Sequence, residues 1–553
     1  MASGLFVLIL AGLLGYNAVR GKVSMLVNSR QVVLLHDELR SRPKDESLKV
    51  RIRQLDLQLR QDTFYRLQLS HDGSRALLAG LVVFLASAHF MRVSRRRLPD
   101  PQAWGARKAG DEKRTAALAR YAVAGIFAVV AAAAVAVSTQ RVSLPERTLT
   151  SPIMPAVAAA PAYPSADEIQ RQWPSFRGPN GLGIAPKAAV PVAWNAKTGE
   201  NICWKTEVPL HGLSSPVVWD NAVFVTGADK TQSSVFRFDA DTGTLQWTAT
   251  IKLPGGARPP TPQVGEDTSL AAPTPVTDGR RIYALFPTGE IAAFDFAGRQ
   301  VWARNIGPLD NSYGYAASLA IYQDRLLIQI DRGQPEDGKS RLLALDTLTG
   351  RQRWEVRREV AGSWSSPVVF DIDGQPQLIT CANPFVISYN PIDGKELWRS
   401  KCLESDVAPS PIMADNMIVA VAPNTAIIGL RSGAAAITWQ AEEGVPDAVS
   451  PISDGQRVYC ISGGGLLTCY VLKTGKVIWT HDLEDSFYAS PTLAGNALIL
   501  VSRKGISWVL EPGDAYKELG RGALGEECCA SPVPLGKRLL LRGKKTLFCI
   551  ESK

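Results

Sequence analysis

The sequence has little of what metal sites and hydrolytic active sites require. Its 553 residues include only five histidines, which are scattered, and no Cys-x-x-Cys or His-x-x-x-His pair occurs. The spacing used by zinc sites is therefore missing, and we predict no metal site. Ser363–Ser366 has neither the glycine spacing nor the partners of a nucleophile elbow, and we find no credible catalytic triad. These absences favour a function other than catalysis.

Charge is absent from three long stretches in the first 140 residues. Met1–Val19, Ala76–Met91 and Tyr121–Gln140 contain no Asp, Glu, Lys or Arg. Each is near the short end of the roughly 17–25 residues that a spanning helix needs. The first stretch could instead be a signal peptide, but no basic region precedes it and no clear cleavage site follows. We therefore predict an α-helical transmembrane region of three spans.

The basic residues orient these predicted spans. Residues 92–114 hold eight Lys or Arg against three acidic residues, and short basic loops stay cytoplasmic. The long C-terminal part is then placed on the other side of the membrane. Much of the net charge of +9 lies beside the apolar stretches, so a membrane explains it better than a nucleic acid does. We predict no nucleic-acid partner.

Two segments between these features carry little specific signal. Residues 23–75 fit an amphipathic helix through Leu48, Ile52, Leu55 and Leu59, although strand alternation also fits part of the same segment. Such a helix would serve self-association or partner contact, or would be a stalk or a helix on the membrane surface. Residues 141–164 are rich in Pro and Ala, a composition typical of a tether.

The most informative feature is an internal repeat in the C-terminal part. Each unit opens with a hydroxyl residue, usually followed by proline, and the period is about 40–50 residues with short strands between turns. One four-stranded unit cannot bury both its faces alone, so such units stack around an axis as propeller blades. The eight openings lie at Ser215-Pro216, Thr274-Pro275, Ser318, Ser366-Pro367, Ser410-Pro411, Ser450-Pro451, Ser490-Pro491 and Ser531-Pro532.

Tryptophans mark the ends of most units and indicate how the ring closes. A glycine turn followed by a closing tryptophan suits interblade packing, in which the indole fills the wedge between two blades. The last unit ends with only three strands, whereas an unassigned strand around Trp204 lies one period before Trp247. We predict that this strand completes the last blade. The structural tryptophans are Trp204, Trp247, Trp302, Trp354, Trp398, Trp439 and Trp479.

These repeats resemble the pyrroloquinoline-quinone (PQQ) repeat propellers of the quinoprotein alcohol dehydrogenase-like superfamily. The close LLALDTLTGRQRW at Leu342–Trp354 and the leading WPSFRGPNGLG at Trp173–Gly183 carry the resemblance with the Ser-Pro openings, over residues 170 to 553. It implies an all-β, eight-bladed β-propeller of four-stranded blades. The expected organisation is transmembrane helices over 1–22, 76–93 and 116–140, an amphipathic segment over 23–75, a cytoplasmic loop over 94–115, a linker over 141–164 and the propeller over 165–553.

Three cysteine pairs are candidate disulfides in an oxidising compartment. If Gly464-Gly465 form a two-residue turn, Cys460 and Cys469 face each other across a hairpin. Cys203 and Cys549 lie on the two strands that we expect to pair in the last blade. The resemblance implies a third pair, Cys528 and Cys529, because quinoprotein enzymes place a vicinal disulfide beside their cofactor.

The resemblance implies two functions. The favoured one is a membrane-anchored, extracytoplasmic scaffold that binds another envelope protein, like the propeller subunit of the outer-membrane barrel assembly machinery. The alternative is a PQQ-dependent dehydrogenase with calcium, although the rest of that cofactor constellation is not matched. We expect no cofactor, and a location at the bacterial cytoplasmic (inner) membrane with the propeller on the periplasmic side. Arg177 either meets an acidic partner or lies in a turn that seals one end of the ring, and His211 is expected at the rim.

Overall fold

A computed structural model describes residues 163–552, except residues 257, 266, 267, 310, 312, 313 and 434. The three apolar stretches, the amphipathic segment and nearly all of the linker lie outside the described residues. Within the described residues, no helix has the length and apolar character needed to cross a membrane.

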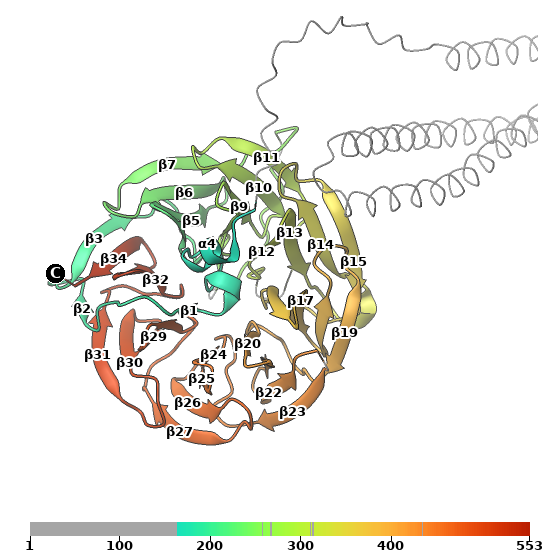
Figure 1. Ribbon diagram of the computed structural model, residues 1–553. Coiled ribbons are helices and arrows are strands. Elements are labelled where there is room, and N and C mark those ends of the chain that lie inside the picture. Colours follow the sequence, from blue (N-terminus) through green and yellow to red (C-terminus); the bar gives the residue numbers. More distant parts are fainter. Residues whose placement is uncertain are drawn as a thin grey trace, which may run out of the picture. The chain divides into compact units, whose positions relative to one another are not determined.

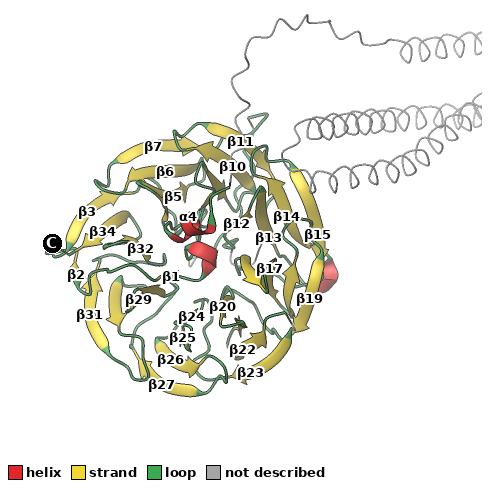
Figure 2. Cartoon of the chain, in the orientation of Figure 1, coloured by secondary structure: helices red, strands yellow, loops and turns green. Residues whose placement is uncertain are grey.

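Eight β-sheets surround a common axis, which confirms the predicted eight-bladed, all-β propeller (Figures 1 and 2). Each blade is an antiparallel meander in which the first strand lies innermost and the fourth lies at the rim. The inner strands are apolar on both faces because neighbouring blades cover both faces. All seven residues of the second strand of blade one, AVFVTGA, are buried, whereas most residues of its fourth strand, LQWTAT, are at least partly exposed.

The strands of blades one to four are β4 (Val217–Trp219), β5 (Ala222–Ala228), β6 (Ser233–Asp239), β7 (Leu245–Thr250), β8 (Val276–Thr277), β9 (Arg281–Leu285), β10 (Glu290–Asp295), β11 (Gln300–Asn305), β12 (Ala320–Tyr322), β13 (Arg325–Ile330), β14 (Ser340–Asp346), β15 (Gln352–Arg358), β16 (Val368–Ile372), β17 (Gln375–Ala382), β18 (Phe385–Tyr389) and β19 (Glu396–Lys401). A 3₁₀ turn, η2 (Pro335–Asp337), interrupts blade three.

The strands of blades five to eight are β20 (Ile412–Ala414), β21 (Met417–Ala422), β22 (Ala426–Arg431), β23 (Ala436–Ala441), β24 (Ile452–Ser453), β25 (Arg457–Ile461), β26 (Leu466–Val471), β27 (Val477–Asp482), β28 (Thr492–Ala494), β29 (Ala497–Val501), β30 (Ile506–Leu510), β31 (Glu518–Ala523), β32 (Val533–Leu535), β33 (Arg538–Arg542), β34 (Thr546–Glu551) and β3 (Ile202–Glu207). The segment before them contains α4 (Ala166–Gln170), a 3₁₀ turn η1 (Pro179–Gly181), β1 (Ile184–Ala185) and β2 (Trp194–Asn195).

The hydroxyl residues that open the repeats form a closed circle of hydrogen bonds around the axis. In each blade the backbone N–H of the opening residue donates to the side-chain hydroxyl of the opening residue in the next blade, at 2.9–3.1 Å. The N–H of Ser531 in blade eight donates to the hydroxyl of Ser215 in blade one, so the circle is complete. We call this set the hydroxyl ring; its members are Ser215, Thr274, Ser318, Ser366, Ser410, Ser450, Ser490 and Ser531.

Tryptophans on the fourth strands join neighbouring blades nearer the rim. Five of them donate their indole N–H, at 2.8–3.0 Å, to a carbonyl that follows the third strand of the next blade: Trp204, Trp247, Trp302, Trp439 and Trp479. In five blades the turn between the third and fourth strands contains a glycine that packs against a tryptophan of the preceding blade. A Cβ at this glycine would lie only 2.3–2.9 Å from that tryptophan ring. These glycines are Gly243, Gly298, Gly350, Gly394 and Gly475. Glycine is therefore needed for close approach as well as for its positive φ.

Two tryptophans depart from this pattern. Trp398 donates to Oε1 of Gln377 in its own blade at 2.8 Å. The side-chain N–H of Trp354 has no hydrogen-bond partner among the described residues, although its ring packs over Gly394 of blade four.

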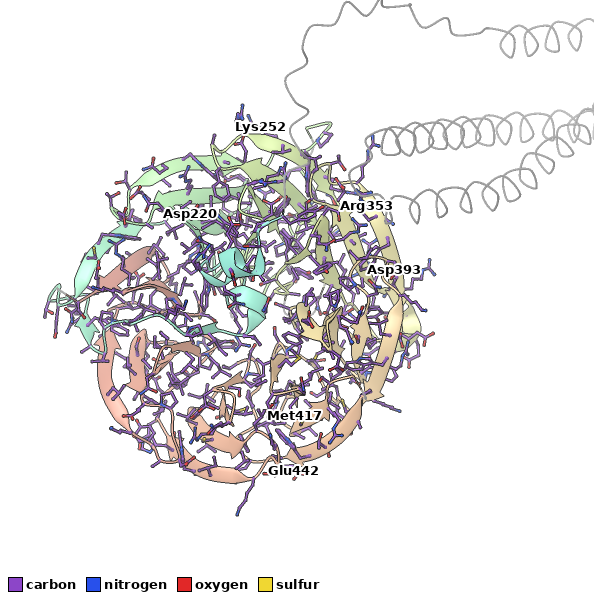
Figure 3. The ribbon with its side chains drawn as sticks, in the orientation of Figure 1. Asp220, Lys252, Arg353, Asp393, Met417 and Glu442 are labelled. Atoms are coloured by element: carbon purple, nitrogen blue, oxygen red, sulfur yellow. The ribbon has the colours of Figure 1, made fainter. Side chains whose placement is uncertain are left out.

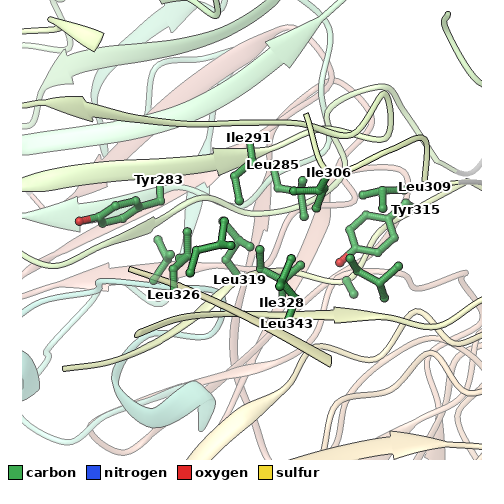
Figure 4. Packing of buried hydrophobic residues seen from close by; sticks show 14 of the residues in the cluster. Tyr283, Leu285, Ile291, Ile306, Leu309, Tyr315, Leu319, Leu326, Ile328 and Leu343 are labelled. Atoms are coloured by element: carbon green, nitrogen blue, oxygen red, sulfur yellow. The ribbon is translucent and has the colours of Figure 1, made fainter. Parts of the chain in front are cut away.

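The core is divided among the interfaces between blades, and side chains fill the space between adjacent ribbons (Figure 3). Figure 4 shows the interface of blades two and three, where Tyr283 and Ile291 meet Leu326 and Leu343. Each of these four side chains is at least 98% buried. Burial on both faces of each sheet supplies the main apolar stabilisation of the ring.

The ring is closed by the strand around Trp204, as the sequence predicts. β3 pairs antiparallel with β34, the last strand of the chain, so residues from both ends of the propeller form blade eight. A bulge lies between Ile202 and Trp204. With this pairing every blade has a fourth strand. The ring therefore has fewer exposed sheet edges.

The segment before β3 crosses blade seven from the axis to the rim (Figure 1). β1 adds to the innermost strand β28 and β2 adds to the outermost strand β31, both in parallel. This sheet therefore has six strands, a feature that the sequence analysis missed. The fourth strand of blade seven lacks a tryptophan, and Trp194 from β2 fills the interface of blades seven and eight instead. A Cβ at Gly522 would lie 1.9 Å from the Trp194 ring, so the glycine makes room for it.

Replacing Ser366 by alanine removes one acceptor from the hydroxyl ring and leaves the buried N–H of Ser318 unpaired. We expect a loss of about 1–3 kcal/mol in the free energy of unfolding, measured by chemical denaturation. Ser365 is a matched control because it is also buried and its hydroxyl has no hydrogen-bond partner. Ser365→Ala should be nearly neutral. Equal losses for the two variants would show that the ring contributes nothing specific.

Trp194→Ala should open a cavity between blades seven and eight, because this side chain is 2% exposed. We expect a loss of about 3–5 kcal/mol, measured in the same way. Val192→Ala, two residues earlier and 41% exposed, is the control and should cost little. A similar, small loss for both variants would mean that Trp194 does not replace the missing interblade tryptophan.

Candidate functional site

One face of the ring is covered at its centre by the chain's own N-terminal segment. We call residues 163–183 the cap; α4 lies over the centre of the ring in Figure 1. The side chain of Ser165 accepts from the N–H of Glu168 and so caps this short helix. Trp173 then pairs with Val218 of β4 through two backbone hydrogen bonds of 2.8 and 3.0 Å. The leading tryptophan motif of the sequence thus fastens the cap to blade one.

Arg177 is buried within this cap, with 1% of its surface exposed. Its Nη2 donates to the carbonyls of Pro451, at 2.5 Å, and Leu182, at 3.2 Å. Burial lowers the pKa of Arg177 to about 9. Arg177 is therefore not available to an acidic partner, and of the two sequence interpretations the structure supports a turn that seals this end of the ring.

A cavity of about 530 Å³ lies between the cap and the inner ends of the first blades. Phe176 of the cap, Trp219 of β4 and Phe370 of β16 give it a mainly apolar lining, and Ser366 and Ser410 of the hydroxyl ring also border it. No cysteine or histidine is among its lining residues. The lining also includes Asp278 and Asp371, so the cavity offers mainly apolar contact with two carboxylates at its border.

The opposite face, which we call the open face, carries the loops that run from the rim of each blade to the start of the next. In every such loop the residue two positions before the hydroxyl-ring member is half-buried. The residue directly before the hydroxyl-ring member is buried. This periodic exposure places one side chain per blade around the axis, just outside the hydroxyl ring. The eight residues are Leu213, Ala272, Ala316, Trp364, Ala408, Ala448, Tyr488 and Cys529.

The loops entering blades five, six and seven give the open face an acidic sector. Residues 402–409, 442–449 and 483–489 contain no Lys or Arg. Their exposed carboxylates are Glu404, Asp406, Glu442, Glu443 and Glu484. We call these five residues the acidic sector; Figure 3 labels Glu442 near the outer rim. Exposed carboxylates of one sign attract a basic surface through long-range electrostatics.

A second, smaller cavity of about 70 Å³ lies on the open face where blades seven, eight and one meet. It is lined by His211 and Gly212 before blade one, by Cys529 before blade eight, and by Arg542 and Lys544. His211 lies in the loop between β3 and β4 and is exposed at this cavity, so its expected place at the rim stays a prediction. Burial, with smaller contributions from the positive charges of Arg542 and Lys544, holds the pKa of His211 below its ordinary value.

None of the three candidate disulfides is formed, and all eight cysteines are free thiols. The prediction for Cys460 and Cys469 is wrong in its register. Cys460 pairs with Thr468, and Cys469 pairs with Tyr459, because the chain turns over residues 462–465 rather than over a two-residue turn. The two thiols therefore lie on opposite faces of blade six, in different interblade clusters.

The other two pairs have different surroundings. Cys203 is exposed at the bulge of β3, and Cys549 is buried on β34 beside it; burial, with a smaller contribution from Cys203, raises the pKa of Cys549 to about 12. Cys528 is buried, and its thiol donates to the carbonyl of Arg542 at 3.2 Å. Cys529 is half-buried and lines the small cavity on the open face.

Comparisons with known proteins agree with this geometry. A family described as outer membrane protein assembly factor BamB matches residues 184–328, 338–454 and 447–517. BamB of Burkholderia pseudomallei is 25% identical over 345 residues, covering 59% of this chain and 81% of that protein. BamB of Bordetella pertussis is 22% identical over 372 residues, covering 63% and 83%. A quinohemoprotein alcohol dehydrogenase from Pseudomonas putida HK5 has a TM-score of 0.53 at 12% identity, covering 70% of this chain and 81% of its own.

The fold and the repeats define a PQQ-like repeat β-propeller of the quinoprotein superfamily. Within that class, the chain belongs to the family of outer membrane protein assembly factor BamB, whose profile matches more than half of its length. This family corrects the expected location. The prediction of the cytoplasmic membrane is wrong, because the family and its relatives are named for the outer membrane.

The described residues do not fit the PQQ and calcium that the resemblance raised as an alternative. Nowhere in the described residues do three or more His, Cys, Asp or Glu side chains form a group that could hold a metal ion. The cavity beside Cys529 is about 70 Å³, well below the roughly 300–1,000 Å³ of cofactor and ligand sites. The larger cavity, beneath the cap, has no cysteine in its lining. We therefore assign no redox step to these residues.

The lowered pKa of His211 predicts a pH effect on stability. In the folded protein the imidazole takes up a proton at a lower pH than in the unfolded chain, where it does so as the pH falls below about 6.5. This residue therefore makes the protein less stable as the pH decreases below that value. The contribution should be absent from His211→Asn, measured as the difference in Tm between the two proteins from about pH 5 to 7.5. A constant difference across this range would contradict the assignment.

Proposed function

We propose that this propeller is a protein-binding scaffold for the assembly of outer membrane proteins, and that the open face is its docking surface. The observation that carries the proposal is the unequal use of the two faces. The cap covers the centre of one face and binds Val218 and Pro451 with its own residues. The open face presents eight loops on a framework held by the hydroxyl ring.

Rigid blades with variable loops suit recognition of a protein surface. The loops are fixed at both ends by strands, so little conformational entropy is lost when a partner binds. The names of the relatives, outer membrane protein assembly factors, indicate the process in which such a partner would take part.

The acidic sector indicates the chemistry of the partner. Its carboxylates project from three successive loops that contain no basic residue. We therefore expect a partner with a basic surface, whose association rate falls as salt is added, because exposed charges are screened within about 10 Å at 0.1 M salt.

Site-specific photocrosslinking in the native envelope tests this proposal. A photoreactive residue at Asp406 or Glu443 on the open face should capture the same envelope protein, identified by mass spectrometry. The same residue at Asp393 or Thr474, in exposed turns near the rim of the opposite face, should capture it much less. Equal capture from both faces, or no reproducible capture from either, would refute the proposal.

A charge variant separates electrostatic recognition from mere proximity. Glu443→Lys should lower the crosslinking yield at Asp406, and the reduction should diminish in high salt, where the wild-type yield also falls. Asp393→Lys makes the same change of charge on the other face and should leave the yield unchanged.

A further inference from the structure

Three arginines are almost completely buried in the propeller, and they differ in their counterions. Arg358 donates from Nη1 to both carboxylate oxygens of Asp331 at 2.6 Å, and from Nη2 to Thr380. Arg177 and Arg542 contact no carboxylate of the described residues, and burial lowers the pKa of each to about 9. A buried cation without a counterion is costly, so an anion that reaches such a guanidinium is bound favourably.

Arg542 differs from Arg177 because it borders a cavity. It is the last residue of β33, and its Nη1 donates to the hydroxyl of Ser214 at 2.5 Å and to the Ser214 carbonyl at 3.1 Å. These bonds fix the guanidinium at the wall of the 70 Å³ cavity, and its Nε and Nη2 have no hydrogen-bond partner in the part of the chain that the structure describes. Gly212 allows this approach, because a Cβ there would lie 2.8 Å from Nη2.

The other lining residues suit a negatively charged ligand. His211, with its pKa held low, has an imidazole N–H to donate at neutral pH. Lys544 lies at the same cavity and is held by Glu527 at 2.8 Å. Arg503 also lines it, with its guanidinium 4.8 Å from the centre of the Tyr488 ring. The cavity thus has three cationic side chains against one carboxylate.

We propose that this cavity is a binding site for a small oxyanion, with the Nε and Nη2 groups of Arg542 as the principal donors. A guanidinium presents parallel N–H groups that match two oxygens of a carboxylate or a phosphate. The volume of the cavity suits a group of that size and excludes a larger cofactor. The site does not depend on the docking surface proposed above.

Binding of simple anions to the full-length protein tests the site. Inorganic phosphate and acetate are titrated separately by calorimetry at constant ionic strength, with sodium chloride as the balancing salt. We expect saturable one-to-one binding of at least one of them. Phosphate alone would identify a tetrahedral ligand, acetate alone a carboxylate, and both an unselective oxyanion site. The absence of saturable binding for both anions would overturn the proposal.

Variants locate the binding. Arg542→Met keeps the length of the side chain and removes its charge, and it should weaken anion binding by about tenfold or more, since hydrogen bonds to charged groups contribute about 1.5–3 kcal/mol. Arg521→Met removes an exposed arginine that is held by Glu518, and it should bind like the wild type. Unchanged affinity in Arg542→Met would also overturn the proposal. If that variant does not fold, His211→Gln supplies a second test and should weaken binding at neutral pH.

Discussion

The hydroxyl ring is the interaction on which the remaining structure depends. Eight backbone N–H groups are buried near the axis, where water cannot pair with them, and each must find an acceptor within the protein. The side-chain hydroxyl of the next blade supplies it, so every blade is positioned by its neighbour. Because Ser531 donates to Ser215, the circle has no free end. The angular spacing of the blades and the placement of their loops both follow from this closure.

Blade seven shows how the chain keeps that geometry where its own repeat is incomplete. Its fourth strand has glycines where the other blades have a closing tryptophan, and the segment before β3 lies against those glycines. Trp194 fills the interface, and β1 extends the same sheet at the axis. The segment that completes blades seven and eight is continuous with the cap. Residues 163–207 therefore close the ring and also cover the centre of one face.

Much of the fold could be predicted from the sequence because the same opening and closing residues recur in successive blades. The Ser-Pro openings and the glycine–tryptophan closes indicate eight blades, and the unassigned strand around Trp204 indicates how the last blade is completed. The register of β25 and β26 was missed because the loop is longer than its central glycines suggest. Trp194 was missed because it stands outside the period. Its only sequence signal was the absence of a tryptophan in blade seven.

The candidate sites were harder to predict, because they are built from residues far apart in the chain. Nothing in the local sequence of Arg542 distinguishes it from Arg358. Arg358 nevertheless forms an ion pair with Asp331, whereas Arg542 does not contact this carboxylate. The two differ in what the neighbouring loop supplies, which is a carboxylate in one case and Ser214 with Gly212 in the other. The family model gives the class of protein, whereas these contacts are the basis of the surface and the chemistry that we propose for this chain.

Hydrogen–deuterium exchange of the hydroxyl-ring amides tests the central claim most directly. If the ring holds all eight blades as one unit, these eight N–H groups should exchange together, only through global unfolding, and should be among the slowest in the propeller. The amides of Ser531 and Ser215, on either side of the closure, should be as protected as that of Ser410. Faster, independent exchange at one blade would show that the circle is not closed in solution and would contradict the account.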